Sequence, residues 1–304
     1  MLLLAGTLPT TDTELHTGTA GLQGNSLTIG NKIVPLNRGT ASMIGAACAV
    51  AHYFGDSPPQ CVVAGDIGKR SGSRLIYHHL TRHLPKAGAT ILGLHYIIPD
   101  IGLHNQVMMA IRKMSPRPCL IADAGFMYVA KASGQAAFYD LFLPDLGELA
   151  FLTEDKASHP AYTRGFLTKL EDDPTRLIEL AYDTGNTAQN LCVKGKTDYI
   201  CNNGKLVEKI VEPTIEELEA IGGTGDTITG MVAGLIYHGF SIVEACTIAC
   251  RTNRRAGQII NPTPAAQITE LIAKIPRALN ETLNDVSGKS SNQNIIKRSN
   301  FTEH

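Results

Sequence analysis

Short apolar runs alternate with longer stretches of helical periodicity over most of the chain. The runs are about five residues long, the usual length of a buried strand, and two of them end in an aspartate, at Asp66 and Asp123. Strands that alternate with helices of about 10–15 residues are typical of a parallel sheet covered by helices on both faces. The pattern therefore predicts an α/β fold with a mostly parallel central sheet.

The individual elements can be placed from residue 27 onwards. The first 30 residues are rich in Thr and Gly and give no clear pattern, apart from a hairpin with a two-residue turn at Gly30-Asn31. The predicted strands cover 61–66, 89–94, 119–123, 142–144 and 190–195, and the predicted helices cover 40–53, 72–84, 101–114, 174–182 and 227–238, with a further helix beginning near Glu148.

One domain accounts for most of the length. No linker rich in Pro, Gly or Ser divides residues 40–285, and a single α/β domain can reach about 300 residues. Residues 286–304 are polar and aperiodic, which predicts a disordered tail. We therefore expect a nucleotide-binding catalytic domain over 1–285 followed by a tail over 286–304.

Composition and charge exclude several classes of protein. The chain has 27 basic and 28 acidic residues, a net charge of −1 and no Trp, which argues against a nucleic-acid-binding or membrane-surface protein. No apolar stretch approaches the roughly 18 residues of a membrane span, and the N-terminus lacks the basic region of a signal peptide. The 7 cysteines are scattered without a CxxC motif, so reduced thiols and a cytoplasmic location are expected.

A glycine-rich turn at 222–226 carries the clearest chemical signal. Its glycines let several backbone N–H groups point one way, and the helix that follows adds the positive end of its dipole, which together favour an anion. Asp226 falls in the first turn of that helix. The alternative is an ordinary acidic residue at a helix start, with no ligand. Gly230 and Gly234, one turn apart on the same helix, favour close helix packing and a preorganised site.

The sequence Ala-Ile-Gly-Gly-Thr-Gly-Asp-Thr-Ile-Thr-Gly-Met-Val-Ala-Gly at 220–234 resembles the signature of the ribokinase-like superfamily. Its Gly-Gly-Thr-Gly-Asp form is most similar to the NAD(P)H-hydrate dehydratase family. Three further blocks occur in that family's order, namely Ile-Ala-Asp-Ala-Gly at 121–125, Leu-Pro-Asp-Leu-Gly-Glu at 143–148 and Leu-Cys-Val-Lys-Gly-Lys-Thr at 191–197. The resemblance implies a ribokinase-like three-layer α/β/α sandwich.

The resemblance also implies roles for individual residues. Asp226 matches the family's catalytic base. The positions that match the nucleotide-phosphate site or anion hole are Gly222, Gly223, Thr224 and Gly225, with Lys194, Gly195 and Thr197. The positions that match the substrate cleft are Asp123, Glu148, Asp66 and Gly68. Asp145 and Glu148 also resemble the acidic pair that organises a hydrated Mg²⁺ in sugar kinases.

The function implied by the resemblance is the repair of hydrated NAD(P)H by a dehydratase that depends on ADP or ATP and Mg²⁺. Two alternatives remain open, because the family's His before the Gly-Glu pair is absent and its Asn-Pro-Gly-Met run before the glycine-rich loop is replaced by Pro-Thr-Ile-Glu-Glu-Leu-Glu. One is a kinase for a hydroxyl group of a sugar or cofactor precursor, and the other is a non-catalytic nucleotide-binding module. The expected partners are a nucleotide and a small metabolite, and a homo-oligomer is left open.

Overall fold

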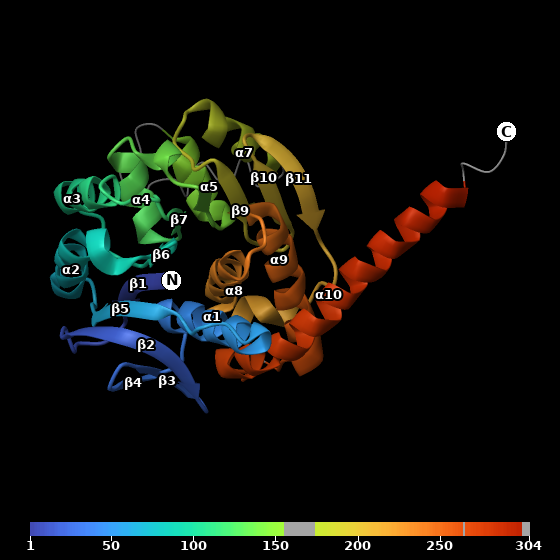
Figure 1. The fold of residues 1–304 in the computed structure, drawn as a ribbon, viewed down its shortest axis with the longest axis horizontal. Coiled ribbons are helices and arrows are strands. Elements are labelled where there is room, and N and C mark those ends of the chain that lie inside the picture. The colour runs from blue at the N-terminus through green and yellow to red at the C-terminus, as the bar shows by residue number, and fades with distance from the viewer. Residues whose placement is uncertain (155–173, 264, 300–304) are drawn as a thin grey trace.

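An 11-stranded sheet runs through the protein, with helices on both of its faces (Figure 1). The computed structural model describes residues 1–154, 174–263 and 265–299, with side chains as far as residue 285. The strand order is β11-β10-β9-β8-β7-β6-β1-β5-β2-β3-β4. The strands are β1 (Leu2–Leu8), β2 (Leu15–Gln23), β3 (Ser26–Ile29), β4 (Lys32–Pro35), β5 (Gln60–Gly65), β6 (Ile91–His95), β7 (Cys119–Ala122), β8 (Leu141–Phe142), β9 (Asn190–Val193), β10 (Asp198–Asn202) and β11 (Lys205–Ile210).

The central strands β5, β1, β6, β7, β8 and β9 are parallel to one another. Antiparallel strands extend the sheet on both sides, with β10 and β11 beyond β9 and β2 to β4 beyond β5. The prediction of an α/β fold with a mostly parallel sheet is therefore confirmed. Because parallel strands all end at the same edge, the loops that follow β5 to β9 gather on one side of the molecule.

Helices bury both faces of the sheet in two apolar cores. Along β1, Leu2 and Leu4 belong to one core, whereas Leu3 and Ala5 belong to the other. The first core is covered by α1 (Thr40–Phe54), α8 (Thr224–His238), α9 (Ile242–Ile260) and α10 (Ile268–Ser299), and the second by α2 (Ser71–Ala87), α3 (Ile101–Ile111), α4 (Gly125–Ala132), α5 (Leu146–Thr153) and α7 (Pro174–Asp183). Within the described residues, no helix combines the length and the apolar character that a membrane crossing requires.

The structure adds strands that the sequence pattern does not predict. β1 lies at the centre of the parallel sheet, between β5 and β6, and every one of its residues is buried. The prediction leaves residues 2–8 unassigned because the first 30 residues, rich in Thr and Gly, give no clear pattern. β2 and the β10–β11 hairpin are also absent from the prediction, whereas the hairpin at Gly30-Asn31 is confirmed by the pairing of β3 with β4.

The end of the chain differs from the predicted tail. The sequence predicts disorder from residue 286, but α10 continues as a helix to Ser299 and projects beyond the body of the domain (Figure 1). The polar segment contains no proline, so nothing in its backbone chemistry stops a helix that starts inside the domain. Residues 300–304 lie outside the described part of the chain.

Helices α1 and α8 approach each other unusually closely. A Cβ atom on Gly230 would overlap the main-chain carbonyl oxygen of Met43, and one on Gly234 would lie 3.0 Å from the Val50 side chain. The two glycines thus let the α8 backbone lie directly on α1, which accounts for their place in a helix interior. This contact also brings the N-termini of the two helices together.

Replacing Gly230 with Ala tests this contact. The added methyl group has no space, so we expect Gly230→Ala to lower the free energy of unfolding by at least the roughly 1–3 kcal/mol typical of overpacking. Gly102→Ala is the matched control, because a Cβ on this exposed glycine of α3 meets only the Asp100 carboxylate, at 3.5 Å. The control should lose no stability, since Ala favours helix over Gly by about 1 kcal/mol. Equal urea midpoints for the two variants would contradict the close contact.

Candidate active site

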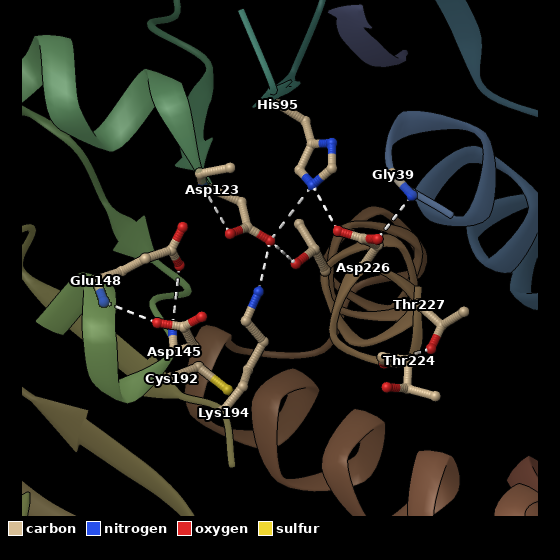
Figure 2. A network of polar contacts seen from close by, with 12 residues as sticks. Gly39, His95, Asp123, Asp145, Glu148, Cys192, Lys194, Thr224, Asp226 and Thr227 are labelled. Carbon is tan, nitrogen blue, oxygen red and sulfur yellow. Dashed lines mark hydrogen bonds and ion pairs between the residues drawn. The ribbon is translucent and has the colours of Figure 1, made fainter. Parts of the chain in front are cut away.

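A cavity of about 940 Å³ lies at the carboxyl ends of the parallel strands. Its walls come from the loops after β6, β7 and β9, from the first turns of α5 and α8, and from the short 3₁₀ helix η3 (Glu216–Ala220). Figure 2 shows the polar side chains that converge there from these separate elements. Because most of them lie at strand ends or helix starts, their positions are fixed by the sheet rather than by long loops.

The Asp226 carboxylate is held at both of its oxygen atoms. It lies in the first turn of α8, with Oδ1 3.0 Å from His95 Nε2, and Oδ2 accepts a hydrogen bond of 2.7 Å from the backbone N–H of Gly39. Burial raises the pKa of Asp226, but the His95 contact, the Lys194 charge and the Gly39 amide outweigh it and lower the pKa to about 2. Asp226 is therefore an ionised carboxylate at the cavity wall.

Gly39 can donate this hydrogen bond because of its backbone conformation. Its φ of 83° and ψ of −145° belong to a region that residues with side chains rarely adopt. Gly39 immediately precedes α1, so the close packing of α1 on α8 carries its N–H group to Asp226.

A buried ion pair lies beside Asp226. Lys194, which follows β9, is 2.7 Å from Asp123 Oδ2, and the Thr229 hydroxyl donates to the same oxygen. Asp123 Oδ1 accepts from the Ala124 N–H at 2.7 Å. Burial lowers the pKa of Lys194, but the Asp123 and Glu148 carboxylates raise it more, so the pKa lies above its usual value and the ammonium group stays charged.

The start of α8 and Lys194 together form a site for an anion. The first N–H groups of a helix have no partner within the helix, and those of Thr224, Gly225 and Asp226 belong to this turn. A Cβ on Gly225 would lie 3.8 Å from Lys194 Nζ, so the ammonium group faces the turn across a space that a side chain would occupy. Positive charge and free donors on two sides suit a phosphate group.

Asp145 and Glu148 form a second acidic group at the start of α5. Glu148 Oε2 accepts from the Asp145 N–H at 3.0 Å, and Asp145 Oδ1 accepts from the Glu148 N–H at 2.7 Å, which is a capping box. The Tyr128 hydroxyl donates to Glu148 Oε1 at 2.6 Å. Burial, followed by the charges of Asp123 and Asp145, raises the pKa of Glu148 to about 8. Glu148 therefore keeps its proton near neutral pH when no cation is bound.

His95, Asp123 and Asp226 also offer three atoms within 4.8 Å of one another that could surround a cation. Lys194 already places its ammonium group on Asp123 Oδ2, and a metal ion there would be repelled. The corner at Asp145 and Glu148, with its excess of carboxylate oxygen, suits a hard divalent cation better.

Known proteins are similar to this chain in sequence and in fold. Residues 102–277, more than half of the chain, match the family model described as NAD(P)H-hydrate dehydratase. The chain belongs to this family. An uncharacterized protein of Methanocaldococcus jannaschii is 43% identical over 242 residues, which are 79% of this chain and 100% of that protein. A bifunctional NAD(P)H-hydrate repair enzyme of Hyperthermus butylicus is 25% identical over 130 residues, which are 42% of this chain but only 24% of that enzyme.

Solved structures show the same fold at low sequence identity. A mutant of phosphofructokinase-2 from Escherichia coli superposes with a TM-score of 0.55 at 15% identity and covers 92% of this chain and 99% of its own. A ribokinase-like superfamily protein of Enterococcus faecalis gives a TM-score of 0.53 at 14% identity, covering 92% and 87%. The predicted ribokinase-like fold is thus confirmed.

The structure brings most of the predicted site residues to one cavity. The predicted residues that line it are Asp123, Asp145, Glu148, Lys194, Gly195, Gly223, Thr224, Gly225 and Asp226. Gly222, Thr197, Asp66 and Gly68 are not among its lining residues. Gly222 instead packs against Arg38, with a distance of 3.2 Å between its would-be Cβ and Arg38 Cδ.

Asp66 has a role within its own loop. Its carboxylate accepts hydrogen bonds from the N–H groups of Gly68, Arg70 and Ser73 and from the Ser73 hydroxyl, at 2.9–3.0 Å. The loop after β5 is closed by these bonds, so both carboxylate oxygens are engaged. The substrate contacts predicted for Asp66 and Gly68 stay predictions.

Several residues of the site cannot be found from the predicted motifs. His95 and Gly39 contact Asp226, yet they lie outside the four blocks that resemble the family. The available signal for His95 is its place directly after the apolar run 91–94, because polar residues at the carboxyl ends of parallel strands face the site. Arg254, which also lines the cavity, is buried and joined to Asp198 at 2.8 Å.

Arg254 also fastens two walls of the cavity. Its guanidinium group donates to the carbonyl oxygens of Gly195 and Lys196, after β9, and of Val211, after β11, at distances of 2.7–3.0 Å. Nη1 binds the segment after β11 and Nη2 binds the loop after β9, so Arg254 is a structural crosslink between the two.

Thermal unfolding between about pH 5 and pH 8 tests the state of Glu148. The pKa of Glu148 is about 8 in the folded protein against 4.5 for an ordinary glutamate. The folded state therefore binds this proton more tightly, and stability is lost as the pH rises from the lower value to the higher. We expect the Tm of the wild type to fall relative to that of Glu148→Gln over this range, in buffer with EDTA.

Asp66→Asn provides a control of opposite sign. Partial burial raises the pKa of Asp66, but the hydrogen bonds from Ser73, Arg70 and Gly68 lower it below 3.8 overall. The ionised carboxylate thus stabilises the fold above that pH, and the wild type should stay more stable than Asp66→Asn throughout. A Tm difference between wild type and Glu148→Gln that does not change with pH would contradict a protonated Glu148.

Proposed function

We propose that this protein is a nucleotide-dependent dehydratase that acts on hydrated NAD(P)H. The observation that carries the proposal is an ionised carboxylate, Asp226, at the wall of a cavity and next to an anion site built from the first turn of α8 and Lys194. This is the arrangement that moves a phosphoryl group to a hydroxyl group. Membership of the dehydratase family supplies the class of substrate.

Asp226 accepts the proton of the substrate hydroxyl. A carboxylate whose pKa is about 2 is a weak base towards a free alcohol. It becomes effective as the alcohol oxygen bonds to phosphorus, because the hydroxyl proton is then strongly acidic. The base thus takes the proton late in the step and does not hold it beforehand.

The anion site binds the terminal phosphates of the nucleotide. ADP or ATP, when bound, supplies the phosphoryl group that converts the substrate hydroxyl into a leaving group. Lys194 neutralises phosphate charge, and its ion pair with Asp123 holds the ammonium group in place while the end of the side chain passes beside Gly225. The glycines of the turn let the phosphate approach the backbone closely.

Asp145 and Glu148 would hold Mg²⁺ through water molecules. Their carboxylates are engaged in the capping box, so bound water suits the ion better than direct bonds from both side chains. Burial, followed by the charges of Asp123 and Asp145, raises the pKa of Glu148, and a divalent cation would favour its ionised form. When bound there, Mg²⁺ would neutralise part of the phosphate charge.

Tyr96 favours a substrate that carries a planar ring. It follows His95 and lines the cavity, and the residue is 48% exposed. Its φ of 50° is uncommon for a residue with a side chain, and such conformations persist where the surrounding structure holds them. The exposed ring offers an apolar face to the dihydronicotinamide, which a sugar substrate would not require.

An absorbance assay tests the activity. We expect the protein to restore the reduced-nicotinamide absorbance of hydrated NADH or NADPH in the presence of ADP or ATP and Mg²⁺. Asp226→Asn keeps the shape and removes the base, so turnover should fall about 10²–10⁴-fold. Asp56→Asn is the matched control, since Asp56 pairs with His238 at the far end of α1 and α8 and should leave turnover unchanged.

The assay also separates the alternatives. Formation of a stable phosphoester from a sugar or vitamin, with no recovery of absorbance, would establish a kinase. Nucleotide binding without either reaction would establish a binding module. Full activity of Asp226→Asn would contradict the assignment of the base.

Nucleotide binding is tested at Gly225. Val at this position would fill the space towards Lys194, whereas Gly223 has a φ of 109° and is crowded by Ser42 and Arg38, so its replacement would damage the turn itself. ADP or ATP with Mg²⁺ at about 100 times its Kd should add roughly 2.7 kcal/mol of stability to the wild type. Gly225→Val should lose this shift, and the exposed Gly102→Val should keep it. A wild-type melting curve that millimolar nucleotide does not move would contradict the anion site.

A further inference from the structure

His95 is a buried imidazole with both ring nitrogens engaged. Nδ1 lies 3.1 Å from the Thr40 hydroxyl, and Nε2 lies 3.0 Å from Asp226 Oδ1. His95 and Thr40 are both 0% exposed. Figure 2 shows the ring above the two carboxylates, with Nε2 pointing down between Asp123 and Asp226.

We propose that His95 is a positioning residue that fixes the orientation and the basicity of Asp226. The proposal rests on the assignment of Asp226 as the base. His95 holds Oδ1 and Gly39 holds Oδ2, so the plane of the carboxylate cannot rotate. The lone pairs that remain face the cavity, which Asp226 lines with 14% of its side chain exposed.

The surroundings of the ring determine its tautomer. Nε2 faces the carboxylate oxygens of Asp226 at 3.0 Å and of Asp123 at 3.7 Å, and ionised carboxylates only accept hydrogen bonds. Nε2 therefore carries a proton, and when the ring is neutral Nδ1 accepts a hydrogen bond from the Thr40 hydroxyl. The Thr40 hydroxyl has no access to solvent, so it orients the imidazole and does not act as a nucleophile.

Charge pairing supports the same assignment. The charged groups that face His95 are Asp226 on α8 and Asp123 after β7, and Lys194 after β9 neutralises Asp123 at 2.7 Å. Asp226 has no lysine or arginine partner among the ion pairs of the described residues. The N–H dipole of His95, or its charge when protonated, is the group that stabilises ionised Asp226.

The neighbouring strand makes room for this arrangement. Gly6 of β1 pairs with His95 in the sheet, and a Cβ there would overlap the His95 carbonyl oxygen and the Thr40 side chain. A glycine in the middle of a buried strand is unfavourable on its own account. Its presence here is explained by the space that Thr40 and His95 need.

Three variants test the proposal. His95→Phe removes the hydrogen-bond donor, and His95→Gln keeps an N–H donor near Nε2 but cannot be charged. Thr40→Val removes only the hydroxyl that orients the ring. We expect kcat/KM with hydrated NADH to fall about 10²-fold in His95→Phe, the cost of a misplaced catalytic group, and to recover in part in His95→Gln.

The pH profile provides a readout that a purely structural role would not move. Without the His95 donor, the pKa of Asp226 rises from about 2, because burial then acts with less opposition. The acid limb of kcat/KM should therefore move to higher pH in His95→Phe and less in His95→Gln. Equal losses in the Gln and Phe variants, with an unchanged acid limb, would overturn the proposal. If the Phe variant does not fold, the Gln and Val variants carry the same test.

A spectroscopic measurement separates this proposal from the proposed function. Long-range ¹H–¹⁵N correlation in the nucleotide-free protein should show the Nε2–H tautomer of His95 in the wild type. This signal should change in Asp226→Asn and in Thr40→Val. An Nδ1–H tautomer, or a spectrum that neither variant changes, would overturn the role of His95 even if the enzyme is active. If the spectra are as expected but the protein has no dehydratase activity, only the proposed reaction is overturned.

Discussion

The candidate site depends on the close contact between α1 and α8. Gly230 and Gly234 remove the side chains that would separate the two helices, so the α8 backbone rests on Met43 and Val50 of α1. The N-termini of both helices consequently meet at the same edge of the sheet. One helix supplies Asp226 and the other supplies the Gly39 N–H that binds it. The core packing and the geometry of the site are thus two results of the same constraint.

The acidic groups of the site differ in how their charge is balanced, and this difference separates the site into two regions. Asp123 is paired with Lys194, and Asp226 is held by His95 and a backbone N–H. At Glu148, burial and then the charges of Asp123 and Asp145 outweigh the Lys194 charge and raise the pKa to about 8. A phosphate group suits the first region and a cation suits the second, so the ligands expected at the two ends of the cavity carry opposite charge.

Sequence patterns predicted the parallel sheet and several polar residues of the cavity, because both follow from local signals. A run such as 119–123 identifies a strand and places Asp123 at its carboxyl end, and the glycine-rich turn places Asp226 at the start of a helix. β1 escaped prediction because it lies within the first 30 residues, whose many Thr and Gly residues hide the pattern. His95, Gly39 and Thr40 escaped because their roles depend on contacts between elements far apart in the sequence. Asp66 is a different case. Its position resembles a family motif, but in the structure its carboxylate accepts hydrogen bonds within its own loop.

The crosslink made by Arg254 has a consequence for how ligands enter. By joining the loop after β9 to the segment after β11, it makes that part of the cavity wall a single rigid block. Lys194 belongs to this block, so its charge stays in one place while ligands come and go. The remaining wall includes the short helix η3, whose residues are all at least partly exposed and which carries Glu216 and Glu219 into the cavity lining. Anionic ligands that enter on the η3 side therefore meet acidic side chains, which would repel polyphosphates that arrive without a cation.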